Sequence, residues 1–181
     1  MIKIQHTKPL LYIIFITILF SGCTLRIGKA SFGYSTSGAS ISPELKTVYV
    51  APFVNRATLI EPTLAQKISD KLKDKVLAQT NLKVVNRSGD VNFDGAIEVF
   101  GTSPMAVSGG QTVVAQQTRL TIGVKITYHN LKEPITDFET SFSKYKDYDS
   151  RLTLAAAEGQ FLDKLIDDLV EDIFNKAFVN W

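Results

Sequence analysis

Residues 119–129 read Arg-Leu-Thr-Ile-Gly-Val-Lys-Ile-Thr-Tyr-His, and apolar and polar side chains alternate along this stretch. One set of alternate positions is apolar: Leu120, Ile122, Val124, Ile126 and Tyr128. The other set is mainly polar: Arg119, Thr121, Lys125, Thr127 and His129. Strict alternation predicts a β-strand with one face on the core and the other face uncovered.

The segments around this strand predict a sheet. Further strands are expected at residues 46–53, 82–85, 91–100 and 138–145, the last forming a hairpin with 119–129 across a turn at 132–136. A Ser-Gly-Gly-Gln turn at 108–111 precedes the central strand. Within 91–100, the alternation predicts that four residues share one face: Phe93, Gly95, Ile97 and Val99.

Two helices are predicted, at residues 62–79 and 152–179. Pro62 suits the first helical position, Thr63 and Gln66 suggest a capping box, and a buried stripe is formed by Leu64, Ile68, Leu72 and Val76. The second helix has a broad apolar face, with Phe161, Leu162, Leu165, Ile166, Leu169, Val170, Ile173 and Phe174. Its acidic side chains are interpreted as solvated surface: Asp163, Asp167, Asp168, Glu171 and Asp172.

The element order favours an α/β (α+β) two-layer sandwich, with a mixed, mainly antiparallel sheet of four to five strands and two helices on one face. We expect a signal peptide at 1–22, a Ser/Gly-rich tether at 23–42 and a single α/β domain at 43–181. Phe32 and Tyr34, the large side chains of residues 31–40, suggest that part of the tether docks on the domain or on a partner.

The N-terminus has the features of a bacterial lipoprotein signal. Lys3 and Lys8 precede an apolar run at residues 10–20, and Ser21 and Gly22 then lead to Cys23, the only cysteine. The run is shorter than the roughly 20 residues that cross a bilayer, so we interpret it as a cleaved signal. A lone exported thiol is accounted for by lipidation, which makes a covalent lipid on Cys23 the expected membrane anchor.

Composition excludes several classes. The chain has 20 basic and 18 acidic residues, and the only charged side chains in 1–22 are Lys3 and Lys8, so the remainder has no net charge. A neutral domain gives no support for nucleic-acid binding, which needs a clustered basic face.

Few residues point to catalysis. After 1–22 the chain holds one histidine, His129, and one cysteine, which is too little for a nucleophilic triad or a zinc site. His129 is interpreted as a surface histidine. Asp147 and Asp149 suggest either Ca²⁺ ligands or a strand end leading to a helix cap, and we favour the second interpretation. We therefore predict no enzyme, no metal site and no cofactor beyond the lipid.

The uncovered sheet face is the candidate functional surface. Arg119, Thr121, Lys125 and Thr127 are expected to face outward there. The face is either plain exposed sheet or a surface for another protein or a phosphorylated glycolipid, which lysine and arginine would contact through phosphate. The sequence favours neither interpretation over the other.

Several segments resemble the lipopolysaccharide-assembly lipoproteins, the LptE family, in their Bacteroidetes-like form. These are GYSTSGASISP at 33–43, KTVYV with FVN at 46–55, PTLAQ with LKDK and QTNL at 62–82, FETSFS with YDS at 138–150, and LVEDIFNK at 169–176 with the final Trp181. The resemblance covers nearly all of the chain after the signal, and its motifs are structural.

The resemblance implies a sheet backed by two helices, in a lipid-anchored protein on the periplasmic side of the outer membrane. It also implies a plug inside a large β-barrel translocon (LptD-like) that assists lipopolysaccharide transport. Thr24, where an aspartate would signal inner-membrane retention, fits this location. The assignment of lipopolysaccharide or partner contact to Arg119, Lys125, Thr121 and Thr127 is a physical inference and is not carried over from the family.

A second hypothesis is a secretion-channel lipoprotein of the curli-pore type, which forms a homo-oligomeric ring. The strand ending in Pro52-Phe53, followed by a helix and a strand, fits that class. Its membrane-spanning hairpin would have to come from residues 91–127, where Arg119 and Lys125 lie on the outer face. Such charges cost ~2–4 kcal/mol each at the bilayer midplane. A third class, a periplasmic hydrolase, lacks catalytic residues.

Overall fold

The computed structural model describes residues 41–59, 61–105 and 117–179. The chain divides into two units, and all of these residues lie in the second, 35–181. The predicted signal at 1–22, Cys23, the tether at 23–42 apart from its last two residues, the turn at 108–111 and Trp181 lie outside the described residues.

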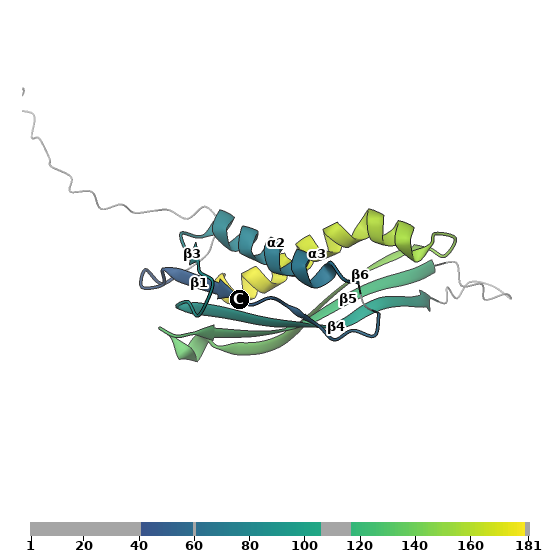
Figure 1. Ribbon diagram of the computed structural model, residues 1–181. Coiled ribbons are helices and arrows are strands. Elements are labelled where there is room, and N and C mark those ends of the chain that lie inside the picture. Colours follow the sequence, from purple (N-terminus) through teal and green to yellow (C-terminus); the bar gives the residue numbers. More distant parts are fainter. Residues whose placement is uncertain (1–40, 60, 106–116, 180–181) are drawn as a thin grey trace, which may run out of the picture. The chain divides into compact units, whose positions relative to one another are not determined.

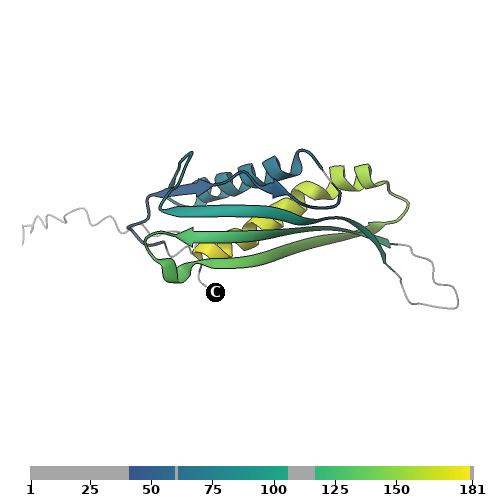
Figure 2. The ribbon, with the colours of Figure 1, turned by 60° about the horizontal axis from the view of Figure 1, so that its bottom comes forward.

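The described part is a two-layer sandwich, as predicted, with a mixed sheet under two helices. The sheet has six strands in the order β3-β1-β4-β5-β6, with β2 also paired to β4. Helices α2 and α3 cover the same side (Figures 1 and 2). The elements are β1 (Thr47–Val50), β2 (Val54–Asn55), α2 (Leu64–Gln79), β3 (Lys83–Val84), β4 (Val91–Met105), β5 (Gln117–Asn130), the 3-10 helix η1 (Pro134–Thr136), β6 (Phe138–Asp149) and α3 (Leu154–Phe178).

The sheet combines long antiparallel and short parallel pairings. Strands β4, β5 and β6 form the antiparallel part, and β1 pairs in parallel with both β3 and β4. Strand β5 confirms the alternation read from the sequence, because Leu120, Ile122, Val124, Ile126 and Tyr128 are buried. The predicted apolar stripe of α2 is buried against this layer as well.

A β-bulge corrects the prediction for β4. Ile97 lies opposite Val124, but Val99 lies opposite Gly123, so Glu98 is an extra residue in the ladder. The bulge reverses the inside–outside alternation beyond it. Phe100 is therefore buried, whereas Val99 is 50% exposed on the face away from the helices.

The acidic face of α3 is largely exposed, as predicted, but part of it is also ion-paired to α2. Lys67, Lys71 and Lys75 of α2 form ion pairs with three acidic side chains of α3, respectively Asp163, Asp167 and Glu171. Both sets are spaced four residues apart, so each occupies one side of its helix and the two sides meet along the seam.

The capping box predicted for α2 is absent from the structure. Thr63 precedes the helix with helical backbone angles and makes no side-chain capping bond. Its hydroxyl instead donates to Glu61 Oε1 at 2.7 Å, and Gln66 Nε2 donates to Asp70 Oδ2 at 2.7 Å. Helix α3 does have a cap, because Thr153 Oγ1 accepts from the Ala156 N–H.

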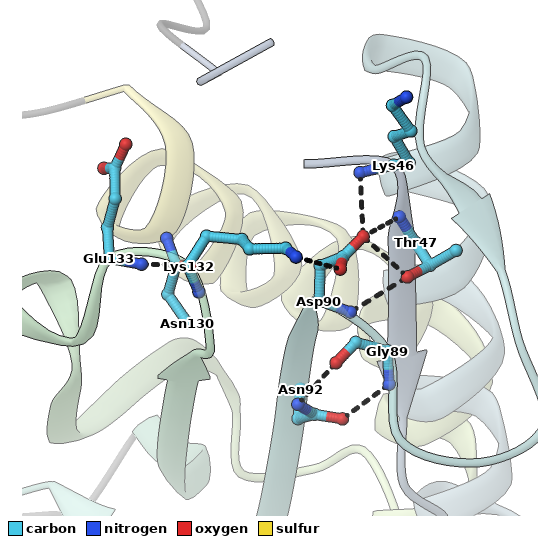
Figure 3. Close-up of polar contacts among 8 residues, drawn as sticks. All are labelled: Lys46, Thr47, Gly89, Asp90, Asn92, Asn130, Lys132 and Glu133. Atoms are coloured by element: carbon cyan, nitrogen blue, oxygen red, sulfur yellow. Dashed lines mark hydrogen bonds and ion pairs between the residues drawn. The ribbon is translucent and has the colours of Figure 1, made fainter. Parts of the chain in front are cut away.

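Asp90 fixes the start of β1 against the start of β4. Its Oδ2 accepts hydrogen bonds from the Lys46 N–H, the Thr47 N–H and the Thr47 hydroxyl at 2.8–3.0 Å, and Lys132 Nζ lies 3.7 Å from Oδ1 (Figure 3). The bond from the Lys46 N–H is the largest of the causes that hold the pKa of Asp90 below its ordinary value.

We expect Asp90 to make the fold sensitive to acid. Because its pKa is lower in the folded state than the ordinary 3.8, ionised Asp90 stabilises the fold above that value. This contribution is lost as the pH falls through the lowered pKa. Asp90→Asn is expected to lower the melting temperature at neutral pH by a few degrees and to flatten the acid side of the stability curve.

Thermal unfolding measured across this pH range checks the prediction. Asp94→Asn is the matched control, because Asp94 is an exposed aspartate four residues further on, within β4, and its side chain makes no hydrogen bond within the described residues. Identical pH profiles for the two variants would contradict the role of Asp90.

Candidate functional site

The face of the sheet away from the helices is the candidate site. Arg119, Thr121, Lys125 and Thr127 all lie on it, because they alternate with the buried residues of β5. Neither helix covers this face, and β4 and β6 flank β5 on it (Figure 2). The structure thus places the four residues on one surface, in two groups.

The first group is centred on Arg119. Its Nε and Nη2 donate to the two carboxylate oxygens of Asp147 at 2.7 and 2.8 Å, across the β5–β6 pair. The guanidinium also lies 3.7 Å from the centroid of the Tyr145 ring, which is 56% exposed. The Arg119 side chain lowers the pKa of Asp147, so this pair stays ionised. Arg119 is therefore a fixed, already paired cation.

The second group surrounds Lys125. Lys125 Nζ pairs with Glu139 on β6, and this bond raises the pKa of Lys125 and lowers that of Glu139. Both side chains, with Thr127, line a shallow hollow of about 350 Å³. Pro52, Val54, Arg56, Asp94 and Ala96 are among its other lining residues.

Three charged residues of this hollow were not predicted from the sequence: Arg56, Asp94 and Glu139. Arg56 follows β2, whose parallel pairing with β4 brings it to the hollow. Its side chain forms no ion pair within the described residues, so it is a free cation beside the paired Lys125. A two-residue parallel pairing leaves no periodic signal, which is why the sequence did not indicate Arg56.

The other candidate residues are tied into local contacts. His129 is exposed, with Nδ1 2.9 Å from Asp137 Oδ2. Asp149 pairs with Arg151, whose side chain lowers the pKa of Asp149 to about 2. Asp147 and Asp149 therefore each face a different arginine, and neither caps α3. Throughout the described ranges, no cluster of three metal-binding side chains occurs.

The described residues thus form a two-layer α/β sandwich, with helices on one side and an open, ion-paired polar surface on the other. Among its described residues, no helix has both the length and the apolar character needed to cross a membrane. The chain belongs to the LptE family, described as lipopolysaccharide-assembly, whose family model matches residues 45–177. This is a family of lipopolysaccharide-assembly lipoproteins and not of enzymes.

Similar solved structures include lipoproteins. A minor lipoprotein from Acinetobacter baumannii matches with a TM-score of 0.48 and 13% identity, covering 73% of this chain and 91% of that one. The PelC dodecamer from Paraburkholderia phytofirmans matches with a TM-score of 0.48 and 12% identity, covering 77% of this chain and 94% of that one. The rare lipoprotein B from Shewanella oneidensis matches with a TM-score of 0.45 and 11% identity, covering 70% of this chain and 91% of that one. A search of curated protein sequences gives no match.

Proposed function

We propose that the chain is an outer-membrane lipoprotein, anchored on the periplasmic side by lipid on Cys23. In this proposal it plugs and helps assemble a large β-barrel translocon of the LptD type and assists lipopolysaccharide transport. Its role is non-catalytic, and it needs no cofactor beyond the covalent lipid. Arg119, Lys125, Thr121 and Thr127 contact lipopolysaccharide or the barrel through the open face of the sheet.

The observation that carries this proposal is the family match over residues 45–177. The open sheet face supports it, because a plug needs a surface that complements a polar barrel lumen. On this face each of Arg119 and Lys125 is held in place by a carboxylate. Prearranged charges of this kind favour specificity more than affinity.

Purification of the tagged full-length protein in mild detergent tests the proposal. We expect a large β-barrel protein to co-purify in a fixed ratio. A homo-oligomeric ring without a barrel would support the secretion-channel hypothesis instead. A monomer without a barrel, in a preparation that binds no lipopolysaccharide, would overturn the proposal.

Charge reversal at Lys125 is expected to weaken the contact. Lys125→Glu would place a carboxylate beside Glu139 and Asp94, so an anionic phosphate would meet repulsion. We expect binding to lipopolysaccharide, measured on the detergent-solubilised protein, to weaken about tenfold or more. The melting temperature should change little, because the substitution lies on an exposed face.

The matched control exchanges the pair, with Lys125→Glu and Glu139→Lys together. It keeps the net charge and the ion pair but moves the cation from β5 to the outermost strand. We expect binding to stay weak, because the cation no longer lies where the native lysine does. Wild-type binding by the single reversal would remove Lys125 from the contact surface.

A further inference from the structure

Strand β6 is an open edge of the sheet. Within the described residues it pairs only with β5, and its other side lies along the border of the sheet (Figure 2). The pairing with β5 runs from Phe138 to Tyr148 and on to Asp149 without a register shift. Because an edge strand pairs on one side only, alternate residues of β6 direct their N–H and C=O groups outward, without a strand partner.

The other edges of the sheet are protected. Strand β3 is two residues long. Beyond Ile97, β4 pairs only with β5, but this part begins with the bulge and contains Pro104, which lacks an N–H. Strand β6 has twelve residues and contains neither proline nor a bulge.

The lysines of β6 do not prevent a further strand from pairing with its edge. Lys144 Nζ lies 2.7 Å from Asp172 Oδ2 of α3, and Lys146 Nζ lies 5.7 Å from the centroid of the Phe161 ring. Both side chains are thus directed to the helix layer. On the open face, Ser141 and Ser143 are small and exposed, so side chains of an added strand would meet no obstacle there.

A row of outward N–H and C=O groups is complementary to one kind of ligand, an extended polypeptide backbone. We propose that β6 accepts an extended segment of another protein, which adds a strand to the sheet. Glu139 and Asp147 lie on the open face of β6, and Lys144 and Lys146 lie on its helix side. We therefore expect the added strand to carry neutral or basic side chains on the open face of the sheet. On the helix side we expect neutral or acidic side chains.

A second copy of the chain is the poorer occupant. An antiparallel copy that overlaps most of β6 would be centred on Ser143 or on Lys144. Pairing centred on Ser143 places Glu139 of one copy opposite Asp147 of the other. Pairing centred on Lys144 places Glu139 opposite Asp149, and the Lys144 residues of the two copies opposite each other. Like charges directly opposite each other destabilise strand pairing.

Site-specific photo-crosslinking in cells tests the proposal. The full-length protein carries a benzophenone amino acid in place of Ser143, and the crosslinked peptide is sequenced by mass spectrometry. We expect one continuous segment of a second protein. Crosslinks to β6 of another copy, to residues 1–40 of the same chain, or to lipid alone would each overturn the proposal.

Hydrogen exchange gives a second readout on the detergent-purified complex. Alternate amides of β6 are expected to exchange fast in the isolated protein and at least tenfold more slowly in the complex. The double variant Ser141→Lys, Ser143→Lys should lose this protection and the crosslink. The control Thr58→Lys, Thr102→Lys adds the same charges at exposed positions after β2 and on β4, neither of which pairs with β6, and should keep both.

This test is separable from that of the proposed function. A barrel that co-purifies while the β6 amides exchange as in the isolated protein would overturn the strand addition alone. Protected β6 amides in a complex without a barrel would overturn the barrel proposal alone.

Discussion

Gly95→Val is expected to destabilise the fold by about 3 kcal/mol or more, at the upper end of the range for overpacked cores. Gly95 lies on the buried side of β4, where the ring of Phe53 packs directly on its backbone. A Cβ atom at this position would lie 2.3 Å from Phe53 Cε1 and 2.5 Å from Cζ. These separations are well inside van der Waals contact, so either the ring or the strand must move.

The Phe53 ring has little freedom to retreat. Phe53 is buried, and its N–H donates to Ser69 Oγ of α2 at 3.0 Å. The Ser69 hydroxyl in turn donates to the Ala65 carbonyl at 2.8 Å, so the backbone beside the ring is tied to the helix. Moving the ring by shifting the Phe53 backbone would break this link to α2, which is why we expect a large effect.

Chemical denaturation of the purified protein measures the loss. Gly101→Val is the matched control, because a Cβ on Gly101 would meet no atom within 4 Å and valine is favoured in strands. In the double variant with Phe53→Ala, the valine should cost less than it does alone, since the ring has gone. Equal stability of Gly95→Val and Gly101→Val would contradict the packing argument.

The sequence predicted the elements whose signal is local. The two-residue period of β5 fixed which side chains are buried, and the four-residue spacing of α2 did the same for its stripe. Each of these patterns depends on one element and on a single buried face. For this reason, the two layers and the open face of the sheet could be predicted without knowledge of the strand order.

Features that depend on two elements at once were missed. The bulge at Glu98 depends on how β4 meets β5, and it moved Val99 to the open face. Arg56 reaches the hollow through the parallel pairing of β2 with β4. The carboxylates that pair with Arg119 and Lys125 lie on β6, opposite or diagonal to them. The periodicity of a single segment cannot indicate such contacts, because each of them depends on how two strands pair.

The helix seam is a different case. The lysines of α2 and the acidic residues of α3 have the same four-residue spacing in the sequence. Complementary stripes on two helices predicted for the same face of a sheet indicate that the helices pack side by side. The charge pattern thus indicated the α2–α3 contact. It was missed because each helix was considered by itself, which assigned the acidic stripe to solvent alone.

Loss of the anchor is expected to have the largest effect on where the protein acts. Behind an ordinary cleavable signal peptide, Cys23→Ser should move nearly all of the protein from the membrane fraction to the soluble periplasmic fraction. Acyl chains contribute ~0.8 kcal/mol per buried CH₂, and stable anchoring takes at least two such chains or one chain and a second signal. Serine accepts no thioether-linked lipid, so the variant would lose all of this binding energy.

Fractionation with mass spectrometry of the mature N-terminus checks the result. Thr24→Asp is the control, because it keeps the lipid and is expected to shift the protein from the outer to the inner membrane. A serine variant that still sediments with the outer membrane, or a wild-type protein whose Cys23 thiol is unmodified, would contradict lipid anchoring. In the first case the barrel contact alone would have to hold the protein at the membrane. The proposed function would then depend on the open sheet face and not on the anchor.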